Sequence, residues 1–136
     1  CNLSQSKAIA AFGNQSGLAF QIWDDYLDVF GDQKVGKTKA GDIYNKKETL
    51  LIIELKHLLT SEDRKIFNRL WSSSIDDQSC KQIILLMEKY QIPEKVKEGV
   101  NEIMKNAAAD LHQKIDKKEW AEPLIDFALQ FIRRTH

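Results

Sequence analysis

Cysteine, proline and glycine are all scarce in this chain. Its 136 residues include two cysteines, two prolines and six glycines. Two lone cysteines give no disulfide framework, and so little proline and glycine argues against collagen and low-complexity sequence. Hydrophobic residues make up 43% of the chain and charged residues 29%, which disfavours wholesale disorder. We therefore expect one domain over residues 1–136, in a reducing compartment such as the cytoplasm.

The chain also lacks a net charge and long apolar runs. Twenty lysines and arginines balance twenty aspartates and glutamates, so the overall balance gives no reason to expect a nucleic-acid partner. The longest apolar runs, such as residues 50–53, are far shorter than the roughly 20 residues that cross a bilayer. We expect no membrane span.

Strand patterns are almost absent, whereas apolar residues recur every three or four positions in several segments. The chain is therefore predicted to be all-α. Helices are expected over residues 5–30, 48–59, 77–90 and 120–133. A further helix is expected to be capped by Ser61, and a long one to have Pro93 in its first turn. A lysine-rich, glycine-punctuated loop is expected over residues 31–47.

One narrow face of the first predicted helix is acidic. Gln21, Asp24, Asp25 and Asp28 are spaced at 0, +3, +4 and +7 on a helix that is otherwise apolar around most of its circumference. Such close carboxylates repel one another unless a cation neutralises them. A solvated acidic edge is the alternative. We predict a Mg²⁺ site, because Mg²⁺ uses one or two carboxylates and keeps its other positions for water and phosphate.

Two glycines extend the acidic line backwards in steps of four. Gly13 and Gly17 lie in the helix interior, where each glycine costs about 1 kcal/mol relative to alanine. We therefore expect something to approach the backbone closely there. The helical segment 13–30 is predicted to lie inside a bundle and to line a central cavity, with the loop 31–47 over its mouth.

Five lysines follow the acidic face within the predicted loop. They are Lys34, Lys37, Lys39, Lys46 and Lys47. Ammonium groups offer point charges to phosphate oxygens that a metal does not reach. An acidic face followed by a basic loop thus indicates a metal-bridged phosphate site, although the loop taken alone could be an ordinary solvated basic segment.

Residues 31–38 match the P-loop pattern G-x-x-x-x-G-K-[ST] at every fixed position. That motif requires a buried strand before it and a helix starting at its lysine. The preceding residues have a helical period, Gly41 breaks any helix after Thr38, and no later strand offers a Walker B aspartate. A P-loop nucleotide-binding module is kept only as an alternative.

A longer pattern covers both segments. The run Gly17-Leu-Ala-Phe-Gln-Ile-Trp-Asp-Asp-Tyr-Leu-Asp28 is followed by Gly31-Asp32, Gly36-Lys37, Gly41-Asp42 and Lys47-Glu-Thr49. It resembles the second aspartate-rich region of the trans-prenyl diphosphate synthases, whose pattern is G-x-x-F-Q-x-x-D-D-x-L-D, then G-D, G-K, G-D and K-x-T. The last predicted helix is more weakly similar to the closing helix of these enzymes.

The resemblance implies an isoprenoid-synthase-type helical bundle and a prenyltransferase that condenses an allylic diphosphate with isopentenyl diphosphate. Asp24 and Asp25, with Asp28, would hold Mg²⁺ against the diphosphate of the allylic substrate. The residues that would contact this diphosphate are Gln21, Lys37 and Lys47. Ionisation of the allylic diphosphate needs no protein nucleophile, and Asp24, Asp25 and Lys37 would act catalytically by stabilising charge on the leaving group.

Part of the family's pattern is missing. Its first aspartate-rich motif, D-D-x-x-D, has no counterpart here, since Asp76-Asp77 is followed by Gln-Ser-Cys, and the chain begins at Cys1. We expect it to correspond to the C-terminal half of such an enzyme and to be inactive alone. Its uncovered apolar faces predict a homo-oligomer such as a dimer. A non-catalytic helical subunit is the second alternative, and product chain length cannot be predicted.

Overall fold

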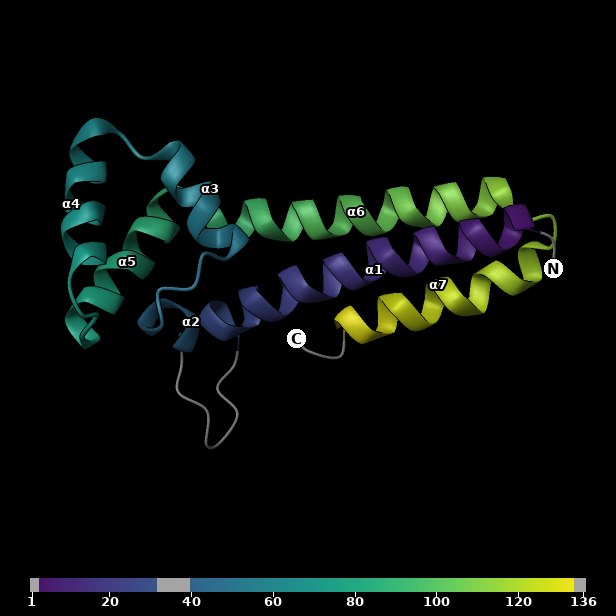
Figure 1. The fold of residues 1–136 in the computed structure, drawn as a ribbon, viewed down its shortest axis with the longest axis horizontal. Coiled ribbons are helices and arrows are strands. Elements are labelled where there is room, and N and C mark those ends of the chain that lie inside the picture. The colour runs from purple at the N-terminus through teal and green to yellow at the C-terminus, as the bar shows by residue number, and fades with distance from the viewer. Residues whose placement is uncertain (1–2, 32–39, 134–136) are drawn as a thin grey trace. The chain divides into compact units, whose positions relative to one another are not determined.

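The structure is a computed structural model that describes residues 3–31 and 40–133. Every regular element in these two ranges is a helix, which confirms the all-α prediction (Figure 1). The helices are α1 (Leu3–Phe30), α2 (Gly41–Tyr44), α3 (Leu50–Leu58), α4 (Ser61–Ser72), α5 (Asp77–Lys89), α6 (Ile92–Lys114) and α7 (Lys118–Arg133). None of the helices described is long and apolar enough to cross a bilayer.

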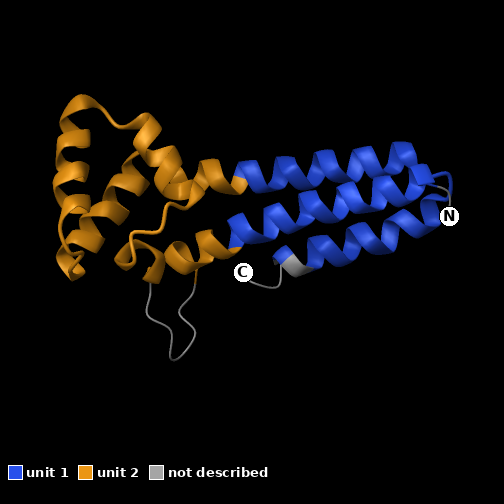
Figure 2. Cartoon of the chain, viewed as in Figure 1, with its two compact units in different colours: residues 1–23, 98–136 blue, residues 24–97 orange. Residues whose placement is uncertain are grey.

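The chain divides into two compact units (Figure 2). The first comprises residues 1–23 and 98–136, and the second comprises residues 24–97. The boundary falls within α1 and within α6, so both helices contribute residues to both units. The expectation of one domain over residues 1–136 stays a prediction.

The first unit is held by apolar stripes on its three helical segments. Their buried residues recur every three or four positions, which is the spacing of one helix face. They include Ala8, Phe12, Ala19 and Ile22 of α1, Val100, Met104, Ala107 and Leu111 of α6, and Ala121, Ile125, Ala128 and Ile132 of α7. The apolar stripe of α6 is thus buried in this unit at these positions, although Ile103 on the same helix is only half-buried.

In the second unit α5 contacts both α3 and α4, and α3 is the most apolar of these three helices. The buried residues of α3 to α5 include Leu51, Ile52, Leu55, Phe67, Leu70, Ile83 and Met87. Each of these helices has a polar N-cap that satisfies a backbone N–H of its first turn. For α4 the cap is Thr60, whose Oγ1 accepts from the Asp63 N–H at 3.3 Å. The predicted cap, Ser61, is wrong by one residue because Ser61 already has helical geometry.

The glycine line of α1 also differs from expectation. Gly13 and Gly17 are exposed, and no atom of the described chain lies within 4 Å of the position that a Cβ would take at either. The close approach to the backbone that their positions predict is therefore not made within the described chain.

Candidate functional site

The last turns of α1 carry the predicted aspartates on one side of the helix. Tyr26 and Val29 are buried in the second unit, which fixes the rotation of this segment. Asp24 is then exposed, while Asp25 and Asp28 are half-buried. The three carboxylates therefore differ in exposure, although their spacing places them on one face of the helix.

Asp25 forms an ion pair with a residue far along the chain. Lys47 Nζ lies 3.0 Å from Asp25 Oδ1 and 3.8 Å from Asp42 Oδ2. The Asp25 side chain retains 13% of its exposure, whereas that of Lys47 retains 51%. The hydrogen bond to Asp25, together with the charges of Asp25 and Asp42, raises the pKa of Lys47. Two residues predicted to share one site are therefore in contact.

Asp28 fastens the segment at residues 40–42 to the end of α1. Its carbonyl oxygen accepts from the Ala40 N–H at 2.8 Å, and its Oδ2 accepts from the Asp42 N–H at 2.9 Å. Ala40 is buried and has a left-handed backbone with a φ of 61°, a strained conformation for a residue with a Cβ. The paired hydrogen bonds to Asp28 help to hold that conformation and set the position of Asp42.

Asp42 lies in an environment that disfavours its charged form. Burial is the main cause that raises the pKa of its carboxyl, and the negative charges of Asp28 and Asp25 add to the effect. The Lys47 ammonium opposes this shift without cancelling it. The Lys47 ammonium therefore compensates only part of what disfavours the Asp42 carboxylate, and carboxyl groups with perturbed pKa values are typical of functional sites.

The Lys47 backbone is held in place by a tight turn after α2. The Lys46 residue adopts a left-handed φ of 53°, and the Lys47 N–H donates to the Asp42 carbonyl oxygen at 2.8 Å. The Thr49 N–H donates in turn to the Lys47 carbonyl oxygen at 2.9 Å. Thr49 is buried and caps α3, so the lysine is tied directly to the core of the second unit.

The donor set fits a hard cation in kind. Carboxylate oxygens are the ligands that Mg²⁺ prefers, and Asp25 and Asp42 both lie within 4 Å of the Lys47 ammonium, so carboxylate oxygens are gathered around one cationic group here. Among the residues described, however, no three or more Asp, Glu, His or Cys side chains are grouped so as to share one ion. The roles of Asp24, Asp25 and Asp28 as metal ligands accordingly stay a prediction, and Asp28 Oδ2 already accepts from the Asp42 amide.

The remaining predicted contacts to diphosphate are not brought together by the described residues. Gln21 is exposed and belongs to the first unit, so its relation to Asp25 and Lys47 stays open. Lys37 lies outside the described residues, as do Lys34 and Lys39. The loop expected over residues 31–47 does contain one short helix, α2, which the sequence reasoning missed.

Asp42 is a residue of the site that was not predicted from the sequence. Asp42 contacts Lys47 with its side chain and Asp28 with its backbone. The signal for it in the sequence is the Gly41-Asp42 pair of the family-like pattern, which lies within the loop predicted for residues 31–47.

The geometry before residue 31 bears on the P-loop alternative. A P-loop needs a strand there, but α1 continues to Phe30, and the Gly31 N–H donates to the Leu27 carbonyl oxygen at 2.9 Å. A Cβ at residue 31 would lie 2.5 Å from that same oxygen, so glycine is needed to end the helix in this way. The residues upstream therefore lack the strand of a nucleotide-binding P-loop.

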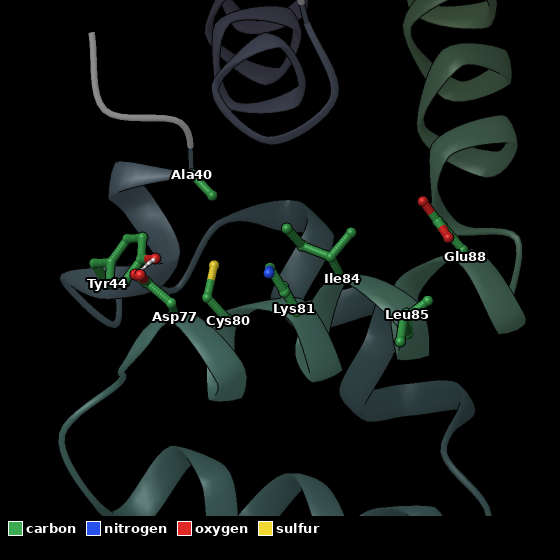
Figure 3. Close-up of a pocket in the computed structure, with 8 residues that line it drawn as sticks. All are labelled: Ala40, Tyr44, Asp77, Cys80, Lys81, Ile84, Leu85 and Glu88. Atoms are coloured by element: carbon green, nitrogen blue, oxygen red, sulfur yellow. Dashed lines mark hydrogen bonds between the residues drawn. The ribbon is translucent and has the colours of Figure 1, made fainter.

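A pocket of about 450 Å³ lies between the α2 region and α5 (Figure 3). Ala40 and Tyr44 line it from one side, and the α5 residues include Asp77, Cys80 and Leu85. The Tyr44 hydroxyl donates to Asp77 Oδ1 at 2.7 Å, and this hydrogen bond is the main cause that raises the pKa of Tyr44. The pocket contains none of the predicted site residues.

Comparison with known proteins identifies the family. The sequence profile described as polyprenyl synthetase matches residues 1–87, which include the whole segment from Gln21 to Thr49. The chain belongs to the polyprenyl synthetase family. The predicted resemblance to trans-prenyl diphosphate synthases is thereby confirmed.

Curated relatives and solved structures agree with this assignment. The chain is 33% identical over 90 residues to the short chain isoprenyl diphosphate synthase of Methanocaldococcus jannaschii, covering 65% of this chain and 28% of that protein. It is 28% identical over 136 residues to the geranylgeranyl diphosphate synthase of Sulfolobus acidocaldarius, covering 98% of this chain and 41% of that protein. The chain thus spans well under half the length of these curated relatives.

The fold is also that of solved prenyl synthases. The decaprenyl diphosphate synthase from Rhodobacter capsulatus matches with a TM-score of 0.84 and 25% identity, over 100% of this chain and 42% of that one. The geranylgeranyl pyrophosphate synthetase from Pyrococcus horikoshii Ot3 matches with a TM-score of 0.80 and 29% identity, over 96% of this chain and 39% of that one. The predicted helical isoprenoid-synthase fold is confirmed.

Proposed function

We propose that this chain supplies the second aspartate-rich motif of a trans-prenyl diphosphate synthase. The reaction is the condensation of an allylic diphosphate with isopentenyl diphosphate to a longer prenyl diphosphate. The single observation that carries the proposal is the contact of Asp25 with Lys47 at 3.0 Å, beside the crowded carboxylate of Asp42. This contact joins a carboxylate, which can bind a metal cation, to an ammonium group, which can bind a phosphate oxygen. The names of the curated relatives support the same reaction class.

Asp24 and Asp25 are the residues that would hold Mg²⁺ in this proposal. Asp24 is exposed and can face a ligand that arrives from solvent, whereas the Asp25 side chain keeps 13% of its exposure and is paired with Lys47. When bound, Mg²⁺ would supply positive charge to the diphosphate oxygens. Asp28 Oδ2 accepts a hydrogen bond from the Asp42 N–H and thereby fixes the position of Asp42 next to Asp25.

Lys47 would donate hydrogen bonds to diphosphate oxygens, together with Lys37 and Gln21. Its side chain is 51% exposed, so its ammonium can reach a ligand outside the cluster. Charge grows on the diphosphate as the allylic bond breaks, and fixed cationic groups stabilise that charge more than they stabilise the ground state. The side chains of this site therefore bind and orient the leaving group, and none has to act as a nucleophile.

The condensation also requires an aligned second substrate. Positioning of two reactants is worth roughly 7 to 11 kcal/mol, so a chain without an isopentenyl diphosphate site would have no measurable rate. We propose that this chain alone is inactive and that it acts as part of a longer or multi-chain enzyme in the cytoplasm. Trp120 and Phe127 are 63% and 67% exposed, which supports a homo-oligomer that covers apolar surface.

Calorimetric titration tests this function against the P-loop alternative. The chain is titrated with geranyl diphosphate and with ATP, each with and without Mg²⁺. We expect geranyl diphosphate to bind only in the presence of Mg²⁺ and more tightly than ATP. Tight ATP binding with no binding of geranyl diphosphate would overturn the proposal.

A further inference from the structure

Lys47 occupies the place in the acidic cluster where a cation would be expected. Its Nζ contacts Asp25 at 3.0 Å and lies 3.8 Å from Asp42. The Asp25 side chain is mostly buried, so little of its surface is left for a second cation while the ammonium is bound. The ammonium and a metal ion would therefore compete for the same carboxylate.

The charges of the cluster explain why the ammonium is held there. Lys47 Nζ lies within 4 Å of carboxylate oxygens of both Asp25 and Asp42, and Asp28 Oδ2 accepts a hydrogen bond from the Asp42 N–H, so three carboxylates and one ammonium are gathered here. In the part of the chain that the structure describes, Lys47 is the cation that contacts this group. An ion pair with a partly exposed lysine is worth little free energy, so it can be exchanged for a stronger cation.

The backbone and the side chain of Lys47 are constrained differently. The backbone is fixed by its hydrogen bond to the Asp42 carbonyl oxygen at 2.8 Å and by the following cap of α3 at Thr49. The side chain is half-exposed and ends in an exchangeable ion pair. The ammonium can therefore leave Asp25 without any rearrangement of the core.

We propose that Lys47 is the built-in counterion of the metal-free cluster, and that it leaves Asp25 when Mg²⁺ binds. This inference rests on the proposed function, since it concerns the same metal and diphosphate. The released ammonium is then available to the diphosphate, so that metal binding prepares the site for the second ligand. The cost is a lower affinity for Mg²⁺ alone, because the metal first has to displace the ammonium.

The proposal predicts effects of opposite sign for one substitution. Lys47→Gln removes the competing ammonium and should tighten the binding of Mg²⁺ alone by about fivefold, the size of a partly exposed ion pair. The same substitution removes a donor to phosphate and should weaken the binding of inorganic pyrophosphate at saturating Mg²⁺. A lysine with a merely structural role would not give this reversal.

The experiment is a pair of calorimetric titrations on the full chain, first with MgCl₂ and then with inorganic pyrophosphate at saturating MgCl₂. Lys65→Gln is the control, because Lys65 is exposed on α4 and its substitution changes the net charge equally. We expect Lys65→Gln to change the affinity for Mg²⁺ less than about twofold.

Each outcome separates this inference from the proposed function. If Lys47→Gln binds Mg²⁺ no more tightly than Lys65→Gln does, the counterion role is wrong and the proposed function stands. If Lys47→Gln tightens Mg²⁺ binding but leaves pyrophosphate binding unchanged, the released Lys47 ammonium does not bind the diphosphate. The second part of the inference, that metal binding prepares the site for the diphosphate, is then wrong. If no variant binds Mg²⁺, the proposed function fails and this inference fails with it.

Discussion

Two aspartates of the second unit are held in opposite ways. Asp63 is buried at the start of α4 and accepts hydrogen bonds from Lys89 Nζ at 2.7 Å and from the Tyr90 hydroxyl. The bond from Lys89, followed by the bond from Tyr90, lowers the pKa of the Asp63 carboxyl. At Asp42, burial and neighbouring carboxylates instead raise the carboxyl pKa.

The difference separates a structural carboxylate from one that is suited to a ligand. The partners of Asp63 come from the end of α5, and the Tyr90 hydroxyl also accepts from the Thr60 N–H at 3.1 Å, so the network joins the start of α4 to the end of α5. Among the described residues, Asp42 has neighbours of its own sign and one exchangeable ammonium, that of Lys47. Groups that the fold leaves under-neutralised are those that a cation can stabilise.

The largest effect is expected for Asp25→Asn. This change removes a proposed metal ligand and the partner of Lys47, so Mg²⁺-dependent binding of geranyl diphosphate should weaken by about 100-fold or more, as for loss of a directly acting group. Calorimetry measures the change. Asp126→Asn is the charge-matched control on an exposed position of α7, and equal losses in both variants would contradict the assignment.

A smaller loss is expected when the anchor of the cluster is removed. Asp28→Ala deletes the acceptor for the Asp42 N–H and should weaken Mg²⁺ binding by about tenfold, as for a residue that orients ligands. Asp28→Asn keeps a side-chain oxygen that can accept the same hydrogen bond, so it should retain more affinity than the alanine variant. If the two variants were equally impaired, the carboxylate charge rather than the hydrogen bond would be the main contribution of Asp28.

Thr49 tests the attachment of the Lys47 segment to the core. Thr49→Ala removes the N-cap of α3, whose Oγ1 accepts from the Ile52 N–H at 3.5 Å, and should lower the free energy of unfolding by about 1 kcal/mol. Thr49→Ser keeps the hydroxyl and should lose less. Urea unfolding measures the free energy of unfolding of both variants. If Thr49→Ala left this free energy unchanged, the cap would not stabilise α3.

The smallest effects are expected in the pH dependence of stability, where the two aspartates should differ in sign. The folded pKa of Asp63 is lowered, so its contribution is present above its unfolded pKa of about 3.9 and is lost as the pH falls through the folded value. Asp63→Asn should therefore be less stable than the parent at neutral pH. This difference should disappear in acid.

The reverse holds for Asp42, whose folded pKa is raised. The folded state then binds more protons, so the Asp42 charge lowers stability as the pH rises through the folded value. Without metal, Asp42→Asn should be more stable than the parent at neutral pH and equal to it below about pH 3. Urea unfolding across this range measures both slopes, and slopes of the same sign would contradict the comparison.

Much of the fold follows from local sequence. The long helices are predictable because their apolar residues repeat with the helical period, and the predicted ends at residues 30 and 133 agree with α1 and α7. The short helix α2 is not predictable in this way. It contains only Gly41–Tyr44, and it depends on hydrogen bonds from Ala40 and Asp42 to Asp28, which is distant in the sequence.

The site is only partly predictable for the same reason. Helical spacing places Asp24, Asp25 and Asp28 on one face of α1, and the pattern of acid followed by base puts Lys47 and Asp25 in one predicted site, within which the structure brings them into contact. The role of Asp42 requires knowledge of burial and of the turn before Lys47, since no local pattern shows that it is desolvated. The prediction of a close approach at Gly13 and Gly17 fails within the described chain, because the position of a residue on a helix face does not show which atoms pack against that face.

The most direct test of the account is the titration of the aspartate carboxyl carbons by ¹³C NMR, with and without Mg²⁺. We expect the pKa of Asp42 to lie above its ordinary value without metal and to fall when Mg²⁺ is added, because the cation favours the charged form. The pKa of Asp63 should lie below its ordinary value and should not respond to Mg²⁺. An Asp42 pKa that is unchanged by Mg²⁺, or an equal response at Asp63, would contradict the proposal that Mg²⁺ binds at Asp24 and Asp25, next to Asp42.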